Sequence, residues 1–164
     1  GRWNPTGSSM NALIKKIILE ICWIAGAYAA AWILLLPLRT YEIAYPFQQA
    51  QVIFIVGGIT FIRWCFLWPL TPFAWSIPLK VLILLGAVPA FLVGFDLFHA
   101  FRVFVHDIGL QELSGHLPVR EQQWMSRYIR GLMVFWATGY MISSLLLIPR
   151  IFRSIWMQLN RNEV

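Results

Sequence analysis

Charged residues are scarce in this chain, and their scarcity excludes an ordinary water-soluble domain. Only 12% of the 164 residues are charged, whereas 59% are hydrophobic, and the mean hydropathy is +0.67. A soluble domain of this length needs more charge to cover its surface. The composition therefore predicts an integral membrane protein, and the lipid bilayer is the first partner that we expect.

Cysteine and histidine are also rare, and no catalytic motif is present. The two cysteines, Cys22 and Cys65, lie within apolar runs and lack the C-x-x-C spacing of a metal or redox site. The sequence has no H-E-x-x-H, P-loop or G-x-S-x-G pattern and no pair of carboxylates at one membrane depth. We predict no catalytic residue, and the sequence favours a non-enzymatic protein while leaving an enzyme as an open alternative.

The net charge of +6 does not indicate nucleic-acid binding. The 13 Lys and Arg residues lie mostly at the ends of apolar runs. Basic residues at these places are typical of cytoplasmic loops and of contacts with phospholipid headgroups. We therefore expect no nucleic acid among the partners of this protein.

Four apolar runs are long enough to cross a hydrocarbon core, which takes about 20 helical residues. We expect spans at about 17–38, 47–70, 79–101 and 131–148. The second and third spans are joined by a short Pro-rich connection, so we expect them to be antiparallel neighbours. The predicted fold is all-α, an antiparallel four-helix membrane bundle in which Pro89 kinks the third span. A short amphipathic extension is expected to follow Pro149.

Residues 1–9 are polar and rich in Gly and Ser, and we interpret them as the remnant of an expression tag. Residues 10–164 then form a single four-span domain. With four spans, both termini lie on the side of the connection between the second and third. Apart from Arg2 in the tag remnant and Arg63 within a span, that side carries six Lys and Arg residues against five on the other, which weakly favours cytoplasmic termini. The longest connection is expected at about 107–123.

An unpaired charge within a span is costly, and three of the ionisable residues in the predicted spans are therefore candidates for a functional role. Glu20 lies one turn into the first span, and Arg63 lies near the end of the second. At about 1.5 Å per residue both lie close to the same membrane face, so we predict a structural ion pair between them. Asp96 lies about 25 Å from that face, and we expect it to link to the start of the fourth span. Binding of a substrate or ion is the alternative role for these residues.

Beyond Asp96 the third span becomes amphipathic. His99 and His106 lie one and three turns further on, so all three residues share a face if the helix continues. Together with Arg127 and Arg130, the two histidines are expected to form a polar face at the membrane edge. Two histidines about 10.5 Å apart on one helix cannot bind the same ion. No metal site and no cofactor is predicted, and haem or metal binding through His99 or His106 is disfavoured.

The junction between the third and fourth predicted spans reads FDLFHAFRVFVHDIGLQELSGHLPVREQQWMSRYIRGLMVFW. It resembles an uncharacterised bacterial family of small four-span inner-membrane proteins of unknown function. The matching features are Pro118 in the loop and Arg127 and Arg130 just before Gly131; Val119 stands where the family usually has Phe. The resemblance implies a four-span fold in a bacterial inner membrane and implies no reaction.

Three hypotheses of function follow. The first is an accessory, regulatory or immunity-type protein that binds another membrane protein through its helix faces or its long loop, because nine Trp and twelve Phe exceed what two interfacial belts need. The second is a small oligomeric transporter or ion channel in which Glu20, Arg63 or Asp96 lines the path. The third is a haem or redox subunit. A second copy of the chain is an alternative partner to another membrane protein.

Overall fold

A computed structural model describes residues 5–74 and 76–161, and all regular structure in this part of the chain is helical. Four helical segments are long and apolar enough to cross a membrane, namely Met10–Leu34, Gln48–Leu70, Ile77–Asp107 and Val119–Asn160. The predicted all-α class with four candidate spans is therefore confirmed. The elements in order are α1 (Pro5–Leu34), α2 (Leu36–Thr40), α3 (Gln48–Leu67), η1 (Trp68–Leu70), η2 (Pro72–Ala74), α4 (Ile77–Asp107), α5 (Leu110–Leu113) and α6 (Val119–Arg161).

The predicted tag remnant, residues 1–9, lies partly outside the described residues, and its origin stays a prediction. Helix α1 begins at Pro5, so the helix starts well before the apolar run at Ile17. A helical segment can extend beyond the part of it that is apolar enough to enter a bilayer.

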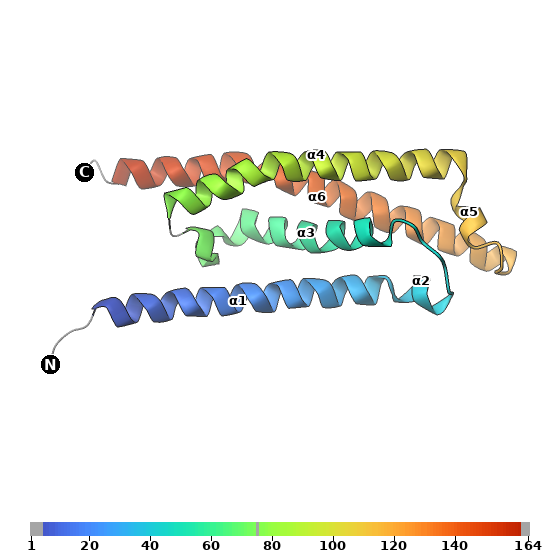
Figure 1. The fold of residues 1–164 in the computed structure, drawn as a ribbon, viewed down its shortest axis with the longest axis horizontal. Helices are drawn as coiled ribbons and strands as arrows, with labels where there is room; N and C mark the ends of the chain where they lie inside the picture. Colours follow the sequence, from blue (N-terminus) through green and yellow to red (C-terminus); the bar gives the residue numbers. More distant parts are fainter. Residues whose placement is uncertain (1–4, 75, 162–164) are drawn as a thin grey trace.

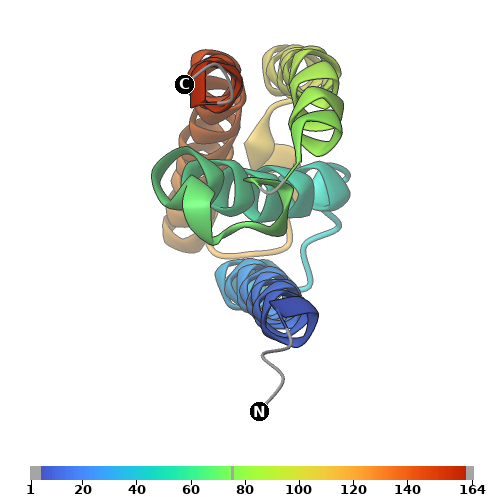
Figure 2. The same ribbon diagram turned by 90° about the vertical axis from the view of Figure 1, so that its left-hand side faces the viewer.

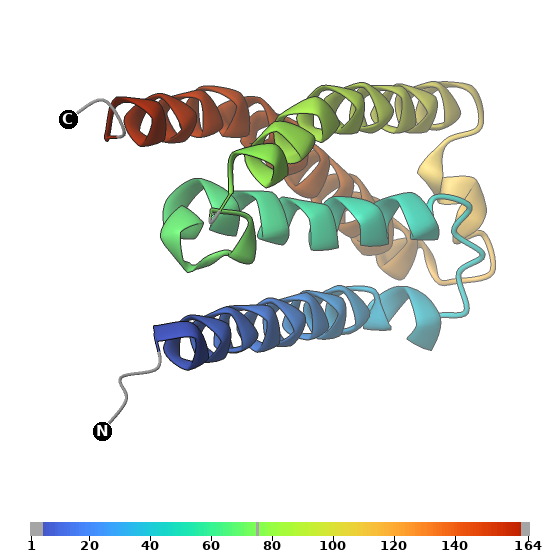
Figure 3. The same cartoon turned by 60° about the vertical axis from the view of Figure 1, so that its left-hand side comes forward.

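Helix α6 is at the centre of the packing. It contacts both α3 and α4, whereas α1 packs mainly on α3. Figure 1 shows that consecutive long helices run in opposite directions, which brings both chain termini to the same end. The end-on view in Figure 2 and the oblique view in Figure 3 show that α6 slants across the other helices.

One face of α6 forms most of the core. Met125, Ile129, Met133 and Ala137 recur every four residues and are at most 1% exposed. Residues at this spacing lie on one side of a helix. They pack with Phe54 and other side chains of the preceding helices in a single buried cluster.

The second and third spans run in opposite directions (Figure 1), but α3 and α4 are not packed along their lengths within the described residues, so the prediction that they are neighbours was wrong. The Tyr140 ring of α6 lies between them, against Gly57 of α3 on one edge and Gly94 of α4 on the other. Glycines allow a neighbouring helix to approach closely. A short connection determines only that the end of one helix lies near the beginning of the next. Here the glycine surfaces of α3 and α4 both pack against α6.

The first span ends earlier than predicted, at Leu34 instead of Leu38. Pro37 lies in the first turn of α2, and a proline cannot donate the backbone hydrogen bond that would continue α1. The Leu34 carbonyl accepts a hydrogen bond of 2.7 Å from the Tyr128 hydroxyl of α6. The break is therefore stabilised by another helix.

Helix α6 extends beyond the predicted fourth span in both directions. It begins at Val119 instead of Gly131 and continues through Pro149 to Arg161. Prolines are tolerated within helices when their surroundings compensate for the lost hydrogen bond. The predicted loop over 107–123 is thus shorter and contains α5, and the predicted separate amphipathic extension is the continuation of α6.

Helix α4 contains Pro89, as predicted, and runs on to Asp107 instead of ending near residue 101. Figures 1 and 3 show that α4 changes direction in its first half. A proline within a helix is the usual cause of such a bend.

Removing the Tyr128 hydroxyl should weaken the contact between α1 and α6. Tyr128→Phe leaves the Leu34 carbonyl without this donor and is expected to lower the free energy of unfolding by about 1 kcal/mol. Thermal denaturation of the purified protein in detergent measures the change.

Tyr45→Phe is the matched control for this prediction. Tyr45 lies between α2 and α3, is 6% exposed, and its hydroxyl has no hydrogen-bond partner within the described residues. Burial raises the pKa of Tyr45 above its ordinary value, so the hydroxyl stays neutral. Its removal should leave stability unchanged or increase it. A larger loss for Tyr45→Phe than for Tyr128→Phe would contradict the hydrogen-bond assignment.

Candidate functional site

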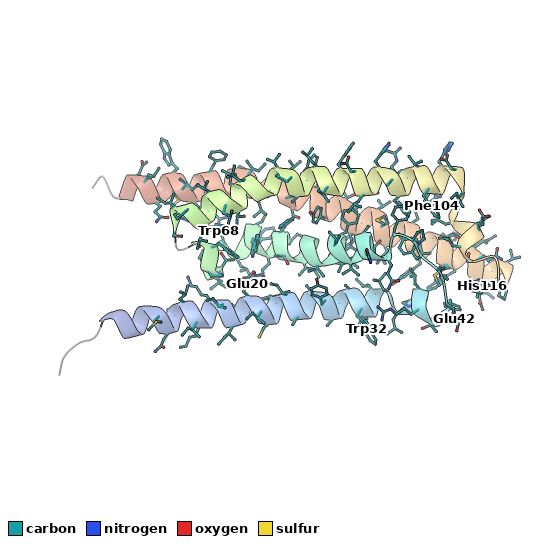
Figure 4. The ribbon with its side chains drawn as sticks, viewed as in Figure 1. Glu20, Trp32, Glu42, Trp68, Phe104 and His116 are labelled. Atoms are coloured by element: carbon teal, nitrogen blue, oxygen red, sulfur yellow. The ribbon has the colours of Figure 1, made fainter. Side chains whose placement is uncertain are left out.

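The polar side chains of interest divide between the two ends of the helix assembly. Figure 4 places Glu20 and Trp68 toward the end that holds the chain termini, and Glu42, Phe104 and His116 toward the opposite end. We call these the terminal end and the loop end. The two ends carry different sets of charged groups.

At the terminal end, Glu20 of α1 forms an ion pair with Arg63 of α3, and their side chains are only 9% and 4% exposed. Trp64 Nε1 donates a hydrogen bond of 2.9 Å to the same carboxylate oxygen, Glu20 Oε1. The Arg63 guanidinium also lies 5.8 Å from the centroid of the Trp23 ring. The pairing predicted from helix depth is confirmed as a contact, and it joins α1 to α3.

Asp96 is exposed on α4 and has no link to the start of α6. Within residues 5–74 and 76–161 it forms no ion pair with Arg127 or Arg130. Gly94 of α4 lies at the level of Tyr140 of α6. Arg130 lies about 15 Å from Tyr140 along α6, toward the loop end. Arg130 is therefore beside the last turns of α4. The predicted link was wrong because the sequence placed the start of α6 too far along the chain.

At the loop end, α4 and α6 enclose a groove of about 680 Å³. Its polar wall consists of His99, Arg102, His106, Asp107 and Arg130. His106 Nδ1 lies 3.0 Å from Asp107 Oδ1, so the groove contains its own counter-charge. The structure thus brings together three of the residues predicted for the polar face.

Arg127, the fourth residue of that predicted face, lines a separate pocket of about 350 Å³ that it shares with Arg130. In the part of the chain that the structure describes, no group of three His, Cys, Asp or Glu side chains is placed to hold a metal ion. The expectation that no cofactor is bound stays a prediction.

The residues that sequence reasoning missed are Lys80 and Arg150 at the terminal end, which it treated only as flanking charges. Lys80 is 3% exposed, and its ammonium donates to Gln158 Oε1 at 2.6 Å and to the Ser154 carbonyl at 3.4 Å. A signal was present in the sequence. Lys80 is the first of four buried α4 positions that lie seven residues apart, and the others are Ala87, Gly94 and Phe101. This spacing indicates a helix-packing face.

Comparison with known proteins identifies no relative: no family model, curated protein or solved structure matches this chain. The class of the protein therefore rests on its own sequence and fold. In the part that the structure describes, its regular structure is helical, with four helices that are long and apolar enough to span a membrane.

Proposed function

We propose that this chain is a non-enzymatic accessory, regulatory or immunity-type protein of the bacterial inner membrane, and that it binds another membrane protein through the exposed face of α4. The supporting observation is Asp96, an exposed carboxylate on a candidate span. Ionisable residues within spans normally have a partner, and Asp96 has no ion pair within the described residues.

The depth of Asp96 along α4 indicates that its partner would lie within the membrane. Along α4 it lies about 24 Å from Lys80, which is less than the roughly 30 Å of a hydrocarbon core. A short carboxylate cannot reach the headgroups as Lys and Arg side chains do. Exposure of a charged side chain to lipid costs at most about 2.5–3.5 kcal/mol, the value at the middle of a span, and a basic side chain of a partner at the depth of Asp96 would remove that cost.

The surroundings of Asp96 suit a partner helix. Leu85 and Leu92 are 67% and 55% exposed and lie seven residues apart, with His99 another seven residues on. This spacing is that of a helix-packing surface. It repeats the spacing of the buried face that α6 covers, so α4 has one occupied face and one exposed face. The proposed partner is a membrane helix with a Lys or Arg at the depth of Asp96.

We also propose how the chain lies in the membrane. The four spans cross as an antiparallel bundle with both termini in the cytoplasm, because, apart from Arg2 and Arg63, the terminal side carries six Lys and Arg residues against five on the loop side and cytoplasmic sides are enriched in such residues. The resemblance at the junction of the third and fourth spans supports the bacterial inner membrane.

Photo-crosslinking in native membranes tests the proposed α4 surface. A photoreactive amino acid at Leu92 is expected to capture one membrane protein, whereas the same group at Ile21 of α1, which is 61% exposed, should capture only lipid. Asp96→Asn should reduce capture at Leu92 by about tenfold or more, because a charge-assisted contact is worth about 1.5–3 kcal/mol.

The decisive control is an exchange of charges. Asp96→Lys should abolish capture, and a Lys→Asp or Arg→Asp change in the captured protein should restore it. Capture that is unaffected by Asp96→Asn, or crosslinks to lipid alone from Leu92, would contradict the proposal. Crosslinks only between copies of this chain would favour the channel hypothesis instead.

A transporter or channel is the second candidate, and one observation favours it. The second carboxylate oxygen of Glu20 is buried without a hydrogen-bond partner within the described residues, which leaves an acceptor for a proton or cation. Purified protein in liposomes should then carry ions, and Glu20→Gln should stop the flux while the helices stay folded. Flux that persists in Glu20→Gln excludes this role for Glu20.

A further inference from the structure

A second pocket, of about 510 Å³, opens at the terminal end between η1, the start of α4 and the C-terminal part of α6. Its polar wall consists of Lys80, Arg150, Ser154 and Gln158, and Trp68 and Met157 contribute apolar surface. Among residues 5–74 and 76–161, no carboxylate lines it. Two cations therefore face one cavity without an acidic group in its described wall.

Lys80 is held in place by neutral oxygens. Its ammonium lies 2.6 Å from Gln158 Oε1 and 3.4 Å from the Ser154 carbonyl. An ammonium group has three donors, so these two contacts leave one donor for a ligand. Neutral acceptors satisfy hydrogen bonds but do not neutralise a charge, and a buried cation is stable only when it is paired.

Arg150 is oriented by the backbone of α3. Its Nε donates a hydrogen bond of 3.2 Å to the Cys65 carbonyl, and the remaining four N–H groups of a guanidinium are suited to bidentate contacts with phosphate or carboxylate oxygens. The pocket wall is further fixed by the hydrogen bond of 3.1 Å from Trp68 Nε1 to Ser154 Oγ. The side chains of Lys80 and Arg150 are thus held in position at the pocket by these contacts.

The charge around the pocket has the same sign. Lys16 Nζ donates to the carbonyl of Pro69, a residue of the pocket wall, at 3.0 Å. The nearest acidic residue of α1, Glu20, is already paired with Arg63. Within the described residues the wall of this pocket therefore carries positive charge without an acidic counter-charge, at the end of the spans, which is where phospholipid headgroups lie.

We propose that this pocket binds an anionic phosphate group, supplied either by the headgroup of an acidic phospholipid or by a soluble phosphate compound. Arg150 contributes the bidentate contact, and Lys80 contributes the buried charge. Basic pockets between membrane helices are known sites for anionic headgroups, and the cavity volume lies within the range of about 300–1,000 Å³ that ligand sites occupy. This site is independent of the exposed α4 surface around Asp96, which lies about 24 Å further along the helix from Lys80.

Native mass spectrometry of the full chain in detergent tests the proposal with three probes, namely phosphatidylglycerol, phosphatidylcholine of the same acyl chains, and inorganic phosphate. Phosphatidylglycerol is expected to bind at least about tenfold more tightly than phosphatidylcholine. Arg150→Gln should lower its affinity by about tenfold or more, the effect of losing a charge-assisted hydrogen bond. Lys80→Gln should act in the same direction.

Arg153→Gln is the matched control, because Arg153 lies one turn further along α6, is exposed and does not line the pocket. It should change the affinity by less than about twofold, and Arg150→Lys should retain part of the binding. If inorganic phosphate displaces the lipid, and if its own binding requires Arg150, the ligand is a soluble phosphate compound. Equal binding of the two lipids, equal effects of Arg150→Gln and Arg153→Gln, or binding of no probe would overturn the proposal. Arg150→Gln keeps the test valid if Lys80→Gln fails to fold.

Discussion

Glu20→Ala is expected to lower the free energy of unfolding by about 3–5 kcal/mol, because it leaves the buried Arg63 guanidinium without its counter-charge. The Arg63 side chain is only 4% exposed. Trp64 also loses the acceptor of its indole N–H. Reversible unfolding in SDS, followed by tryptophan fluorescence, measures the loss.

A double-mutant cycle separates a structural pair from a functional site. Glu20→Met and Arg63→Met alone should each cost a similar amount, whereas the double variant Glu20→Met with Arg63→Met should be far less destabilising than either single variant, because apolar replacement of a buried pair is often nearly neutral. Single and double variants that are equally unstable would show that the pair does not act as a unit. If the double variant folds but loses ion flux in liposomes, the two residues serve transport.

Gly94→Ala and Gly57→Ala should each cost about 1–3 kcal/mol by overpacking the Tyr140 ring. A Cβ at Gly57 would lie 2.5 Å from Tyr140 Cε2, and a Cβ at Gly94 would lie 2.6 Å from Cε1. The ring is held from both edges, so it cannot move away from one glycine without approaching the other. Thermal denaturation in detergent gives the size of the effect.

Gly86→Ala in α4 is the control, because, apart from the adjoining residues and backbone of its own helix, no atom of the described residues lies within 4 Å of the position of its added Cβ. Alanine is a better helix former than glycine by about 1 kcal/mol, so Gly86→Ala should be neutral or stabilising. Tyr140→Leu should reduce the cost of Gly94→Ala, since the shorter side chain frees the space. Equal effects at Gly86 and Gly94 would contradict the assigned packing.

The membrane depth of the charged residues in the first and second spans could be predicted from the sequence. The rise per residue placed Glu20 and Arg63 near one face, and the structure pairs them. The same arithmetic failed for Asp96, because it depended on where α6 begins. That start is set by burial of Met125 and Ile129, and tertiary contacts of this kind are not visible in a scan for apolar runs.

The choice of neighbouring helices was the part that was predicted wrongly from the sequence. Gly57 and Gly94 lie in different spans, and only the three-dimensional packing shows that both face Tyr140. The pocket around Lys80 was missed because a lysine near the end of a span ordinarily extends to the headgroups. Here it is 3% exposed.

Cysteine accessibility tests the central claim most directly, namely that the terminal end and the loop end lie on opposite sides of a bacterial inner membrane. Thr40→Cys and Arg153→Cys are placed singly in a chain carrying Cys22→Ser and Cys65→Ala. With a membrane-impermeant maleimide applied to intact spheroplasts, we expect labelling at position 40 and protection at position 153 until the membrane is opened. Labelling at 153 with protection at 40 would reverse the proposed orientation while keeping the four crossings. Equal labelling of both positions in intact spheroplasts would contradict the four-span account itself.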